Sequence, residues 1–319
     1  MGYYLVTGGA GFIGSNLVEA LVKSGKKVRV LDNFSTGLKE HLEPFGEDID
    51  LTEGDIRDKD IVNRSMKDVD YVFHLAANRA VLKSVENPSE THDVNVTGTL
   101  NLLLAARDAK VKRFVFTSSS AVYGDTKKVP SRETDSMSPQ SPYGVSKVLG
   151  EEYCRFFARE FGLDTISLRY FNIYGPRQHP ESRYSLVIPI FMDCLLKGES
   201  PEIHWDGKQT RDFIYVGDVI QAYLLAIQGP KKNGEAFNIS TGKALSILEV
   251  FKTLARKLKR EDIKPSFAPK RAGDVRQTLA DVRKAKKELG FKAAVEFEEG
   301  IQKSIDFYLR TKKKEKVCL

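Results

Sequence analysis

Short apolar runs alternate with longer amphipathic segments through the first half of the chain. The apolar runs lie at 3–7, 27–31, 71–76, 114–118 and 165–170. Between them, apolar side chains recur with the spacing of one helix face in 15–24, 97–109 and 143–161. Strands that are apolar on both faces are typical of a parallel sheet that helices cover on either side. The pattern therefore predicts a doubly wound α/β domain.

This rhythm weakens after residue 172, where glycine and proline become frequent, as in GPRQHP and KGESPEIHWDGKQ. Such stretches predict loops, and loops carried on a rigid domain are where ligands are usually bound. We therefore expect a smaller C-terminal α/β lobe. The larger domain is placed at 1–168 with part of about 211–240, and the smaller lobe at about 169–210 and 241–319.

Composition narrows the class of protein. The net charge of the 319 residues is +7, with basic clusters at 257–260, 283–287 and 312–316. No aromatic residues interleave with these clusters, so we expect solvated helix faces and a charged tail rather than a nucleic-acid surface. No window approaches ~18 apolar residues, which argues against a membrane span. The sparse cysteines and histidines lack disulfide or metal-ligand spacing, which favours a cytoplasmic protein without a metal site.

A glycine-rich turn joins the first predicted strand to the first predicted helix. Gly8, Gly11 and Gly14 lie in TGGAGFIG at 7–14. Glycines here allow a tight turn, a close approach of pyrophosphate to the helix N-terminus, and a close helix–strand contact. Asp32 ends the second strand, where a carboxylate binds the adenosine ribose and repels a 2′-phosphate. These residues predict an NAD site rather than an NADP site; the alternative is a glycine turn without a ligand.

Tyr143 and Lys147 are one turn apart on a predicted helix and so lie on the same face. A tyrosine, with an ordinary pKa of ~10, is a poor base at neutral pH unless a nearby cation stabilises its phenolate. Lys147 can supply that charge and also hold the nicotinamide ribose, which makes Tyr143 the candidate base. The alternative is an amphipathic helix surface. Serines at 118–120 favour catalysis, because they end a buried strand where doubly wound sheets bind ligands.

The glycine spacing GxxGxxG, together with YGVSK at 143–147, resembles the extended branch of the short-chain dehydrogenase/reductase superfamily. Further matches are GDI at 54–56, HLAA at 74–77 and NVTGT at 95–99. The resemblance implies a Rossmann domain and places Ser119 at the family's catalytic serine position, between the substrate oxygen and Tyr143. It extends the NAD site to Phe12, Ile13, Asn33, Asp55, Ile56, Leu75, Ala76, Ala77, Asn95, Ser118, Tyr143, Lys147 and Tyr170.

The residues after Ser119 bear on the reaction. Sugar-nucleotide 4,6-dehydratases of this branch carry Asp-Glu there, and UDP-glucuronate decarboxylases carry a Glu two residues before the tyrosine. This chain has Ser120 and Ala121 instead. With no carboxylate to take the C5 proton, a 4-keto intermediate would take its hydride back, on the other face if the sugar has turned. The resemblance thus implies C4 epimerisation of a UDP-hexose without net redox change.

The resemblance also implies a UDP-sugar site in the smaller lobe. Arg211 and Arg271 would clamp the diphosphate, because guanidinium groups bind phosphate oxygens in pairs. Asp274 would bind the uridine ribose, and Arg79 would lie near the diphosphate. The alternative for each arginine is a surface salt bridge. Further substrate contacts are implied for Ser119, Ser120, Tyr143, Asn172, Leu186, Val187 and Phe213.

Thr278 bears on the choice of sugar. It falls where epimerases restricted to UDP-glucose carry a bulky tyrosine, and a smaller side chain leaves room for a 2-acetamido group. The run at 171–189 also resembles epimerases that prefer UDP-N-acetylglucosamine. We therefore expect the chain to accept UDP-glucose, UDP-galactose and their N-acetylated forms.

Two other functions are compatible with the same motifs. A UDP-glucuronate 4-epimerase would use the same catalytic residues with a polar contact for the C6 carboxylate. A non-catalytic relative would bind the dinucleotide and act as a redox sensor or RNA-binding protein, but such proteins usually lose the tyrosine or the lysine. The resemblance also suggests a homodimer through a four-helix contact of 97–109 and 143–161; both helices could instead pack only on their own sheet.

Overall fold

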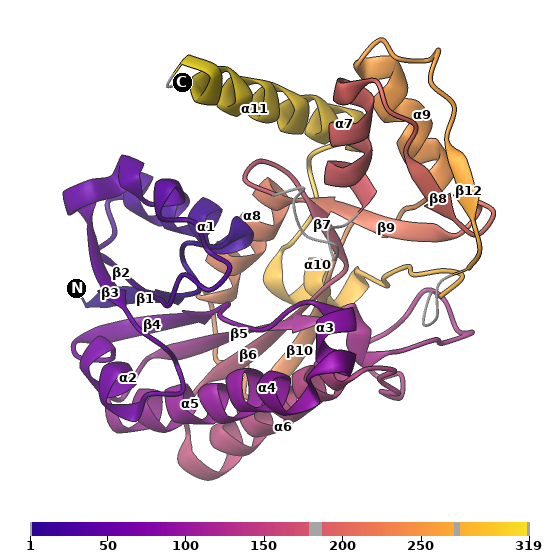
Figure 1. Ribbon diagram of the computed structural model, residues 1–319. Coiled ribbons are helices and arrows are strands. Elements are labelled where there is room, and N and C mark those ends of the chain that lie inside the picture. Colours follow the sequence, from indigo (N-terminus) through magenta and orange to yellow (C-terminus); the bar gives the residue numbers. More distant parts are fainter. Residues whose placement is uncertain (1, 179–186, 271–274, 318–319) are drawn as a thin grey trace.

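A parallel sheet of seven strands forms the larger domain (Figure 1). The computed structural model describes residues 2–178, 187–270 and 275–317. The strand order is β10-β6-β5-β4-β1-β2-β3. The bounds are β1 Tyr3–Thr7, β2 Val28–Asp32, β3 Ile49–Glu53, β4 Val69–His74, β5 Arg113–Ser119, β6 Thr165–Tyr170 and β10 Glu235–Ile239. Because the chain adds β2 and β3 on one side of β1 and β4 to β6 on the other, the predicted doubly wound fold is confirmed.

Helices cover both faces of this sheet (Figure 1). One face carries α1 (Phe12–Lys23), α8 (Val216–Ala226) and α10 (Arg283–Leu289), and the other α2 (Lys59–Ser65), α5 (Gly98–Asp108) and α6 (Pro142–Phe161). Successive side chains of a strand point to opposite faces. Val6 accordingly lies in one core cluster with Leu17 of α1, and Leu5 lies in the other with Leu102 of α5. The sheet is therefore buried on both sides, as its apolar strands require.

The smaller lobe begins at the carboxyl edge of the large sheet, where β7 follows β6. Its strands are β7 (Asn172–Tyr174), β8 (Glu202–His204), β9 (Thr210–Tyr215), β11 (Ala244–Ser246) and β12 (Ser266–Ala268), and its helices are α7 (Val187–Lys197), α9 (Ile247–Lys257) and α11 (Phe297–Val317). The strands pair in the orders β11-β9-β7 and β12-β8. Phe191, Phe251 and Ile301 lie in its core. The residue boundaries expected for the two domains stay a prediction.

The helix that carries Tyr143 and Lys147 has well-defined ends. Ser141 precedes it, and the Ser141 side chain accepts a hydrogen bond of 3.1 Å from the backbone N–H of Gly144. Gly162 ends it in the left-handed conformation, with φ at +67°. These caps set where the helix begins and ends. In the described part of the chain, no helix is long and apolar enough to cross a membrane.

Candidate functional site

The glycine loop between β1 and α1 is packed so closely that side chains are excluded. Gly8 has a φ of +70°, and a Cβ on it would lie 2.8 Å from the backbone nitrogen of Ala76. A Cβ on Gly14 would lie 2.1 Å from the carbonyl oxygen of Gly8. Around Gly11, by contrast, a Cβ would contact only that oxygen, at 3.3 Å. The loop is thus closed toward the protein at Gly8 and Gly14 and open in front of Gly11.

The first turn of α1 faces this opening. Phe12 and Ile13 begin the helix after Gly11, which has an extended backbone and makes no side-chain cap. The first N–H groups of a helix have no partner within the helix, and together with the helix dipole they attract anions. The loop and the first turn therefore form a cradle that suits a pyrophosphate.

Asp32 closes one side of the cradle. Its carboxylate is buried and accepts hydrogen bonds of 2.8 Å from the backbone N–H groups of Ala10 and Phe34. Burial raises the pKa of Asp32, and these two bonds oppose that shift. The carboxylate is thus held beside the glycine loop, where a ribose hydroxyl would meet it.

Asn33 and Asp55 also lie together at this edge of the sheet. The side-chain amide of Asn33 donates to Asp55 Oδ2 at 2.9 Å. Asp55 also pairs with Arg57, and these hydrogen bonds lower the pKa of Asp55 to about 2. Ile56 is buried in the core next to α5. The carboxylate of Asp55 therefore stays ionised at any physiological pH.

The end of β4 is tied to β1 and α5 through His74. Its ring lies 2.8 Å from the hydroxyl of Thr7 and 2.8 Å from that of Thr99. Thr7 in turn accepts hydrogen bonds of 3.2 Å from the backbone N–H groups of Leu75 and Ala76. Burial lowers the pKa of His74 to about 3, so the ring is neutral. Ala77 follows in the same loop.

Asn95 connects three segments around the site. It lies in a π-helical turn, Asp93–Thr97, that precedes α5. Its amide pairs with both backbone groups of Asn78, at 2.7 and 3.0 Å, and donates to the hydroxyl of Ser146 on α6 at 3.0 Å. Turns of this kind are frequent at functional sites.

Tyr143, Lys147 and Ser119 meet at the carboxyl end of β5. Burial raises the pKa of Tyr143, while a hydrogen bond with the Ser119 side chain and the charge of Arg79 lower it. The Lys147 ammonium donates to the carbonyl oxygen of Thr117 at 2.8 Å and lies 5.7 Å from the centre of the Tyr143 ring. Burial lowers the pKa of Lys147 to about 8. Displaced pKa values of this kind are typical of catalytic sites.

The neighbouring serines have separate surroundings. The Ser118 hydroxyl donates to Glu151 of α6 at 2.5 Å and is buried, so its side chain serves the β5–α6 contact. Its predicted role at the cofactor stays a prediction. Ser120 begins a short 3-10 turn, and its carbonyl oxygen accepts from the N–H of Tyr123 at 3.0 Å. Tyr170 ends β6 and is buried, and the centre of its ring lies 5.4 Å from the centre of the Tyr223 ring.

Two of the predicted substrate-binding residues, Asn172 and Thr278, are in contact in the smaller lobe. The Asn172 amide donates to the hydroxyl of Thr278 at 3.3 Å and to the carbonyl oxygen of Asp212 at 3.2 Å. Arg211 lies two residues from Phe213 on β9 and donates to the carbonyl oxygen of Thr210 at 2.9 Å.

Other predicted substrate contacts lie elsewhere or are not described. Phe213 is buried against Tyr174 and Phe297 in the core of the smaller lobe, so its contact with a ligand stays a prediction. Val187 begins α7 at the edge of the same core. Three predicted contacts lie outside the described residues: Leu186, Arg271 and Asp274.

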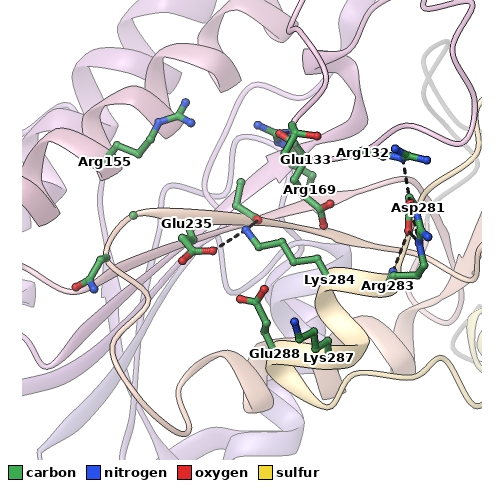
Figure 2. A pocket seen from close by; sticks show the side chains of 14 residues that line it. Arg132, Glu133, Arg155, Arg169, Glu235, Asp281, Arg283, Lys284, Lys287 and Glu288 are labelled. Carbon is green, nitrogen blue, oxygen red and sulfur yellow. Dashed lines mark hydrogen bonds and ion pairs between the residues drawn. The ribbon is translucent and has the colours of Figure 1, made fainter.

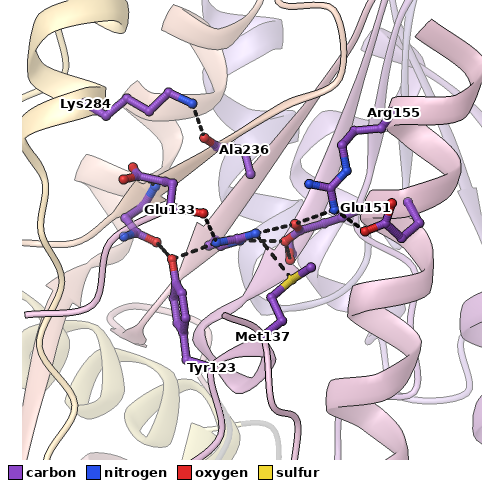
Figure 3. Close-up of polar contacts among 11 residues, drawn as sticks. Tyr123, Glu133, Met137, Glu151, Arg155, Ala236 and Lys284 are labelled. Carbon is purple, nitrogen blue, oxygen red and sulfur yellow. Dashed lines mark hydrogen bonds and ion pairs between the residues drawn. The ribbon is translucent and has the colours of Figure 1, made fainter. Parts of the chain in front are cut away.

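A buried ion pair, in which Glu151 also accepts a hydrogen bond from Ser118, was missed by sequence reasoning (Figure 3). Glu151 and Arg169 each expose 1% of their side chains, and Arg169 Nε and Nη2 donate to the two carboxylate oxygens at 2.8 and 2.7 Å. Arg169 also donates to the hydroxyl of Tyr123 at 2.8 Å. A signal was present in the sequence, because Arg169 interrupts an apolar strand and Glu151 lies one turn beyond Lys147.

No group of histidine, cysteine, aspartate and glutamate side chains within the described ranges could hold a metal ion. The side chains at the end of β5 have the chemistry that acid–base catalysis requires. Tyr143 can exchange a proton, Lys147 can stabilise its phenolate, and Ser119 can bridge the phenol and a bound hydroxyl.

Comparisons with known proteins agree with this geometry. The sequence profile of the GDP-mannose 4,6 dehydratase family matches residues 5–304. A putative UDP-glucose 4-epimerase of Methanocaldococcus jannaschii is 43% identical over 307 residues, which cover 95% of this chain and 97% of that protein.

Solved structures are similar over almost the whole chain. The UDP-N-acetylglucosamine 4-epimerase of Methanobrevibacter ruminantium, in complex with UDP-N-acetylmuramic acid, has a TM-score of 0.92 and 37% identity, covering 97% of this chain and 99% of that one. The UDP-glucose 4-epimerase of Thermus thermophilus, in complex with NAD, has a TM-score of 0.88 and 36% identity, covering 96% and 99%. This chain therefore belongs to the GDP-mannose 4,6 dehydratase family, in the extended branch of the short-chain dehydrogenases/reductases.

Proposed function

We propose that this protein is an NAD-dependent 4-epimerase that interconverts UDP-glucose with UDP-galactose, and their N-acetylated forms with each other. The observation that carries the proposal is the meeting of Ser119, Tyr143 and Lys147 at the carboxyl end of β5, followed by Ser120 and Ala121 rather than by carboxylates. The activities named for the full-length relatives support the same reaction.

NAD fits the residues at this edge of the sheet. The space in front of Gly11 and the first turn of α1 suit the pyrophosphate, and the buried Asp32 carboxylate suits the adenosine ribose. When bound, NAD would supply reversible hydride transfer at C4 of the sugar. The relative from Thermus thermophilus, solved with NAD, supports this assignment.

The side chains divide the proton chemistry among them. Tyr143 would take the proton of the C4 hydroxyl as that carbon is oxidised, and return it after the sugar has turned. Lys147, held by the Thr117 carbonyl, would stabilise the phenolate, and Ser119 would orient the hydroxyl. Because Ser120 and Ala121 cannot accept a proton as a carboxylate would, the proton on C5 stays in place and the 4-keto sugar is reduced again.

The smaller lobe would hold the UDP and select the sugar. Arg211 lies on β9 in this lobe, and we propose that it acts with Arg271 on the diphosphate and that Asp274 binds the ribose. Thr278 contacts Asn172, so both side chains are at one place in the lobe. A threonine there leaves space beside C2 of the sugar, and this supports turnover of N-acetylated substrates.

We also propose that the protein forms a homodimer through α5 and α6. Leu103 and Phe157 are buried in their own domain and cannot contribute. Val145 and Phe156 of α6 are 44% and 43% exposed, however. A cavity of about 590 Å³ beside α6 includes Val145 and Leu149 in its lining. Exposed apolar side chains such as Val145 and Phe156 are typical of an association surface.

A proton NMR time course tests the proposed reaction. Purified protein without added NAD is mixed separately with UDP-galactose, UDP-N-acetylgalactosamine and UDP-galacturonate. We expect new anomeric signals of the gluco epimer with the first two substrates. Turnover of UDP-galacturonate alone would indicate a UDP-glucuronate 4-epimerase, and no turnover even with added NAD would favour a non-catalytic binder.

A further inference from the structure

Helix α6 is attached to the end of β5 at two consecutive strand residues. The Lys147 ammonium donates to the carbonyl oxygen of Thr117 at 2.8 Å. One helical turn later, the carboxylate of Glu151 accepts from the hydroxyl of Ser118 at 2.5 Å. Ser119 follows immediately, and its side chain is close enough to Tyr143 to lower the pKa of the tyrosine. The position of Ser119 relative to Tyr143 therefore depends on both attachments.

Glu151 is itself held rigidly (Figure 3). Arg169 on β6 binds both of its oxygens, and Arg169 is held in turn by the hydroxyl of Tyr123 and the carbonyl oxygen of Glu133. The Tyr123 hydroxyl donates to the side chain of Asn238 at 2.7 Å. Burying an ion pair is costly, and apolar residues in its place are often no less stable. The pair thus needs a reason beyond stability, and it lies directly behind the catalytic residues.

The titratable groups around Lys147 indicate what the buried pair does. On its own helix it faces Tyr143, Glu151 and Cys154, and on β4 it faces His74. Burial raises the pKa of the Cys154 thiol and lowers that of His74, so both are neutral at physiological pH. On β5 it meets only the Phe116 ring, at 5.0 Å, and a carbonyl oxygen. Within the described part of the chain, Glu151 is thus the anion that acts on Lys147.

We propose that Glu151 is a positioning residue for the epimerase reaction: it holds the end of β5 so that Ser119 meets Tyr143, and it keeps Lys147 in its ammonium form. The charge role follows from its place one turn beyond Lys147 on the buried face of α6. The inference rests on the proposed function for its catalytic consequence, but the effect on Lys147 is independent of any activity.

Arg169 also lines a cavity (Figure 2), and an ion pair at the rim of this cavity offers a control variant for the proposal. The cavity measures about 600 Å³, and three of its basic side chains are paired with carboxylates of its own lining: Arg132 and Arg283 with Asp281, and Lys284 with Glu235 at 2.6 Å. At its rim, Arg155 pairs with Glu152 at 2.6 Å, and the Glu152 side chain is 55% exposed. Glu152 follows Glu151 in the same helix but faces solvent, so Glu152→Gln is the matched control.

The first experiment measures the pKa of Lys147 without using activity. Competitive acetylation of the NAD-free protein across a pH series, followed by mass spectrometry of the Lys147 peptide, reports the neutral fraction of this lysine. Because removal of a nearby anion disfavours the ammonium form, Glu151→Gln should move the labelling midpoint to lower pH by about one unit. Glu152→Gln should leave the midpoint where it is. An unchanged midpoint in Glu151→Gln would overturn the charge role.

The second experiment measures kcat against pH with UDP-galactose. Ionised Lys147 is present below its pKa, so activity should be lost as pH rises through that value. Lowering the pKa in Glu151→Gln should therefore move the alkaline limb to lower pH by the same unit, with a roughly tenfold lower kcat. If kcat falls in Glu151→Gln but the alkaline limb stays at the wild-type pH, Glu151 has only a structural role. An inactive wild-type protein with the labelling shift intact would reject the proposed function and leave the link between Glu151 and Lys147 standing.

If Glu151→Gln does not fold, the double variant Glu151→Gln/Arg169→Met removes both buried charges, which proteins usually tolerate better than one unpaired charge. The charged neighbour that raises the pKa of Lys147 is Glu151 and not Arg169. The double variant should therefore shift the labelling midpoint in the same direction, and a midpoint at the wild-type pH would reject the proposal.

Discussion

The two halves of the candidate active site, the glycine loop and the β5–α6 junction, owe their geometry to different kinds of groups. At the glycine loop, backbone segments pack so closely that only glycine fits, because a Cβ on Gly14 would lie 2.1 Å from a carbonyl oxygen. At the β5–α6 junction the geometry comes from buried charges, with Lys147, Glu151 and Arg169 all under 5% exposed. The first region is sensitive to added atoms and the second to changed protonation. This difference can be tested in each region separately.

Tyr143→Phe should have the largest effect. The variant keeps the ring but loses the proton that the reaction exchanges, so kcat should fall by about 10³-fold. NAD affinity and thermal stability should stay close to those of the wild type, because the substitution leaves the glycine loop untouched. Steady-state kinetics and NAD titration measure both. A loss of NAD affinity as large as the loss of kcat would mean that the junction and the loop do not act separately.

Gly14→Ala and Gly11→Ala test the backbone half as a matched pair. The first adds a methyl group against the carbonyl oxygen of Gly8 and should lower the free energy of unfolding by about 2–4 kcal/mol. The second adds it on the open side, at 3.3 Å from the same oxygen, and should cost less than about 1 kcal/mol while weakening NAD binding at least tenfold. Urea unfolding and calorimetric titration separate the two. If both variants lost the same free energy of unfolding, the loop would not be closed at Gly14 and open at Gly11 as described.

Thr278→Tyr tests whether the smaller lobe selects the sugar by space alone. The larger side chain should exclude the 2-acetamido group, so the kcat/KM ratio of UDP-galactose to UDP-N-acetylgalactosamine should rise about 100-fold. The UDP-galactose activity should be retained. Similar losses for both substrates would show that Thr278 acts through Asn172 or the fold rather than through space at C2.

His74→Gln changes the side chain that links β1, β4 and α5, and it should have the smallest effect at neutral pH. The pKa of His74 is about 3 in the folded protein, against ~6.5 in an unfolded chain. As pH falls below ~6.5, the unfolded chain binds this proton first, so stability is lost by up to about 1.4 kcal/mol per pH unit until pH reaches about 3. The variant should lack this part of the slope in chemical unfolding of the NAD-free protein. An unchanged slope would mean that other groups set the acid stability.

The regular elements of the larger domain were mostly predictable, and the exceptions have physical causes. The runs at 3–7 and 165–170 match β1 and β6, because central strands are buried on both faces and therefore mostly apolar. β3 was missed because it lies at the sheet edge, where most of its side chains are exposed. β10 was missed because it lies within the loop-rich second half of the chain, although it completes the opposite edge of the sheet.

The sequence by itself determined the cofactor loop and the Tyr143–Lys147 pair, because each lies within one turn or one loop, and local spacing settles which groups meet. Only the tertiary structure decided what lies behind them. Asn172 and Thr278 are 106 residues apart but in contact. Ser118 and Arg169 converge on Glu151 from two strands. Such meetings depend on strand order and helix packing, which bring distant segments together at distances that no local pattern encodes.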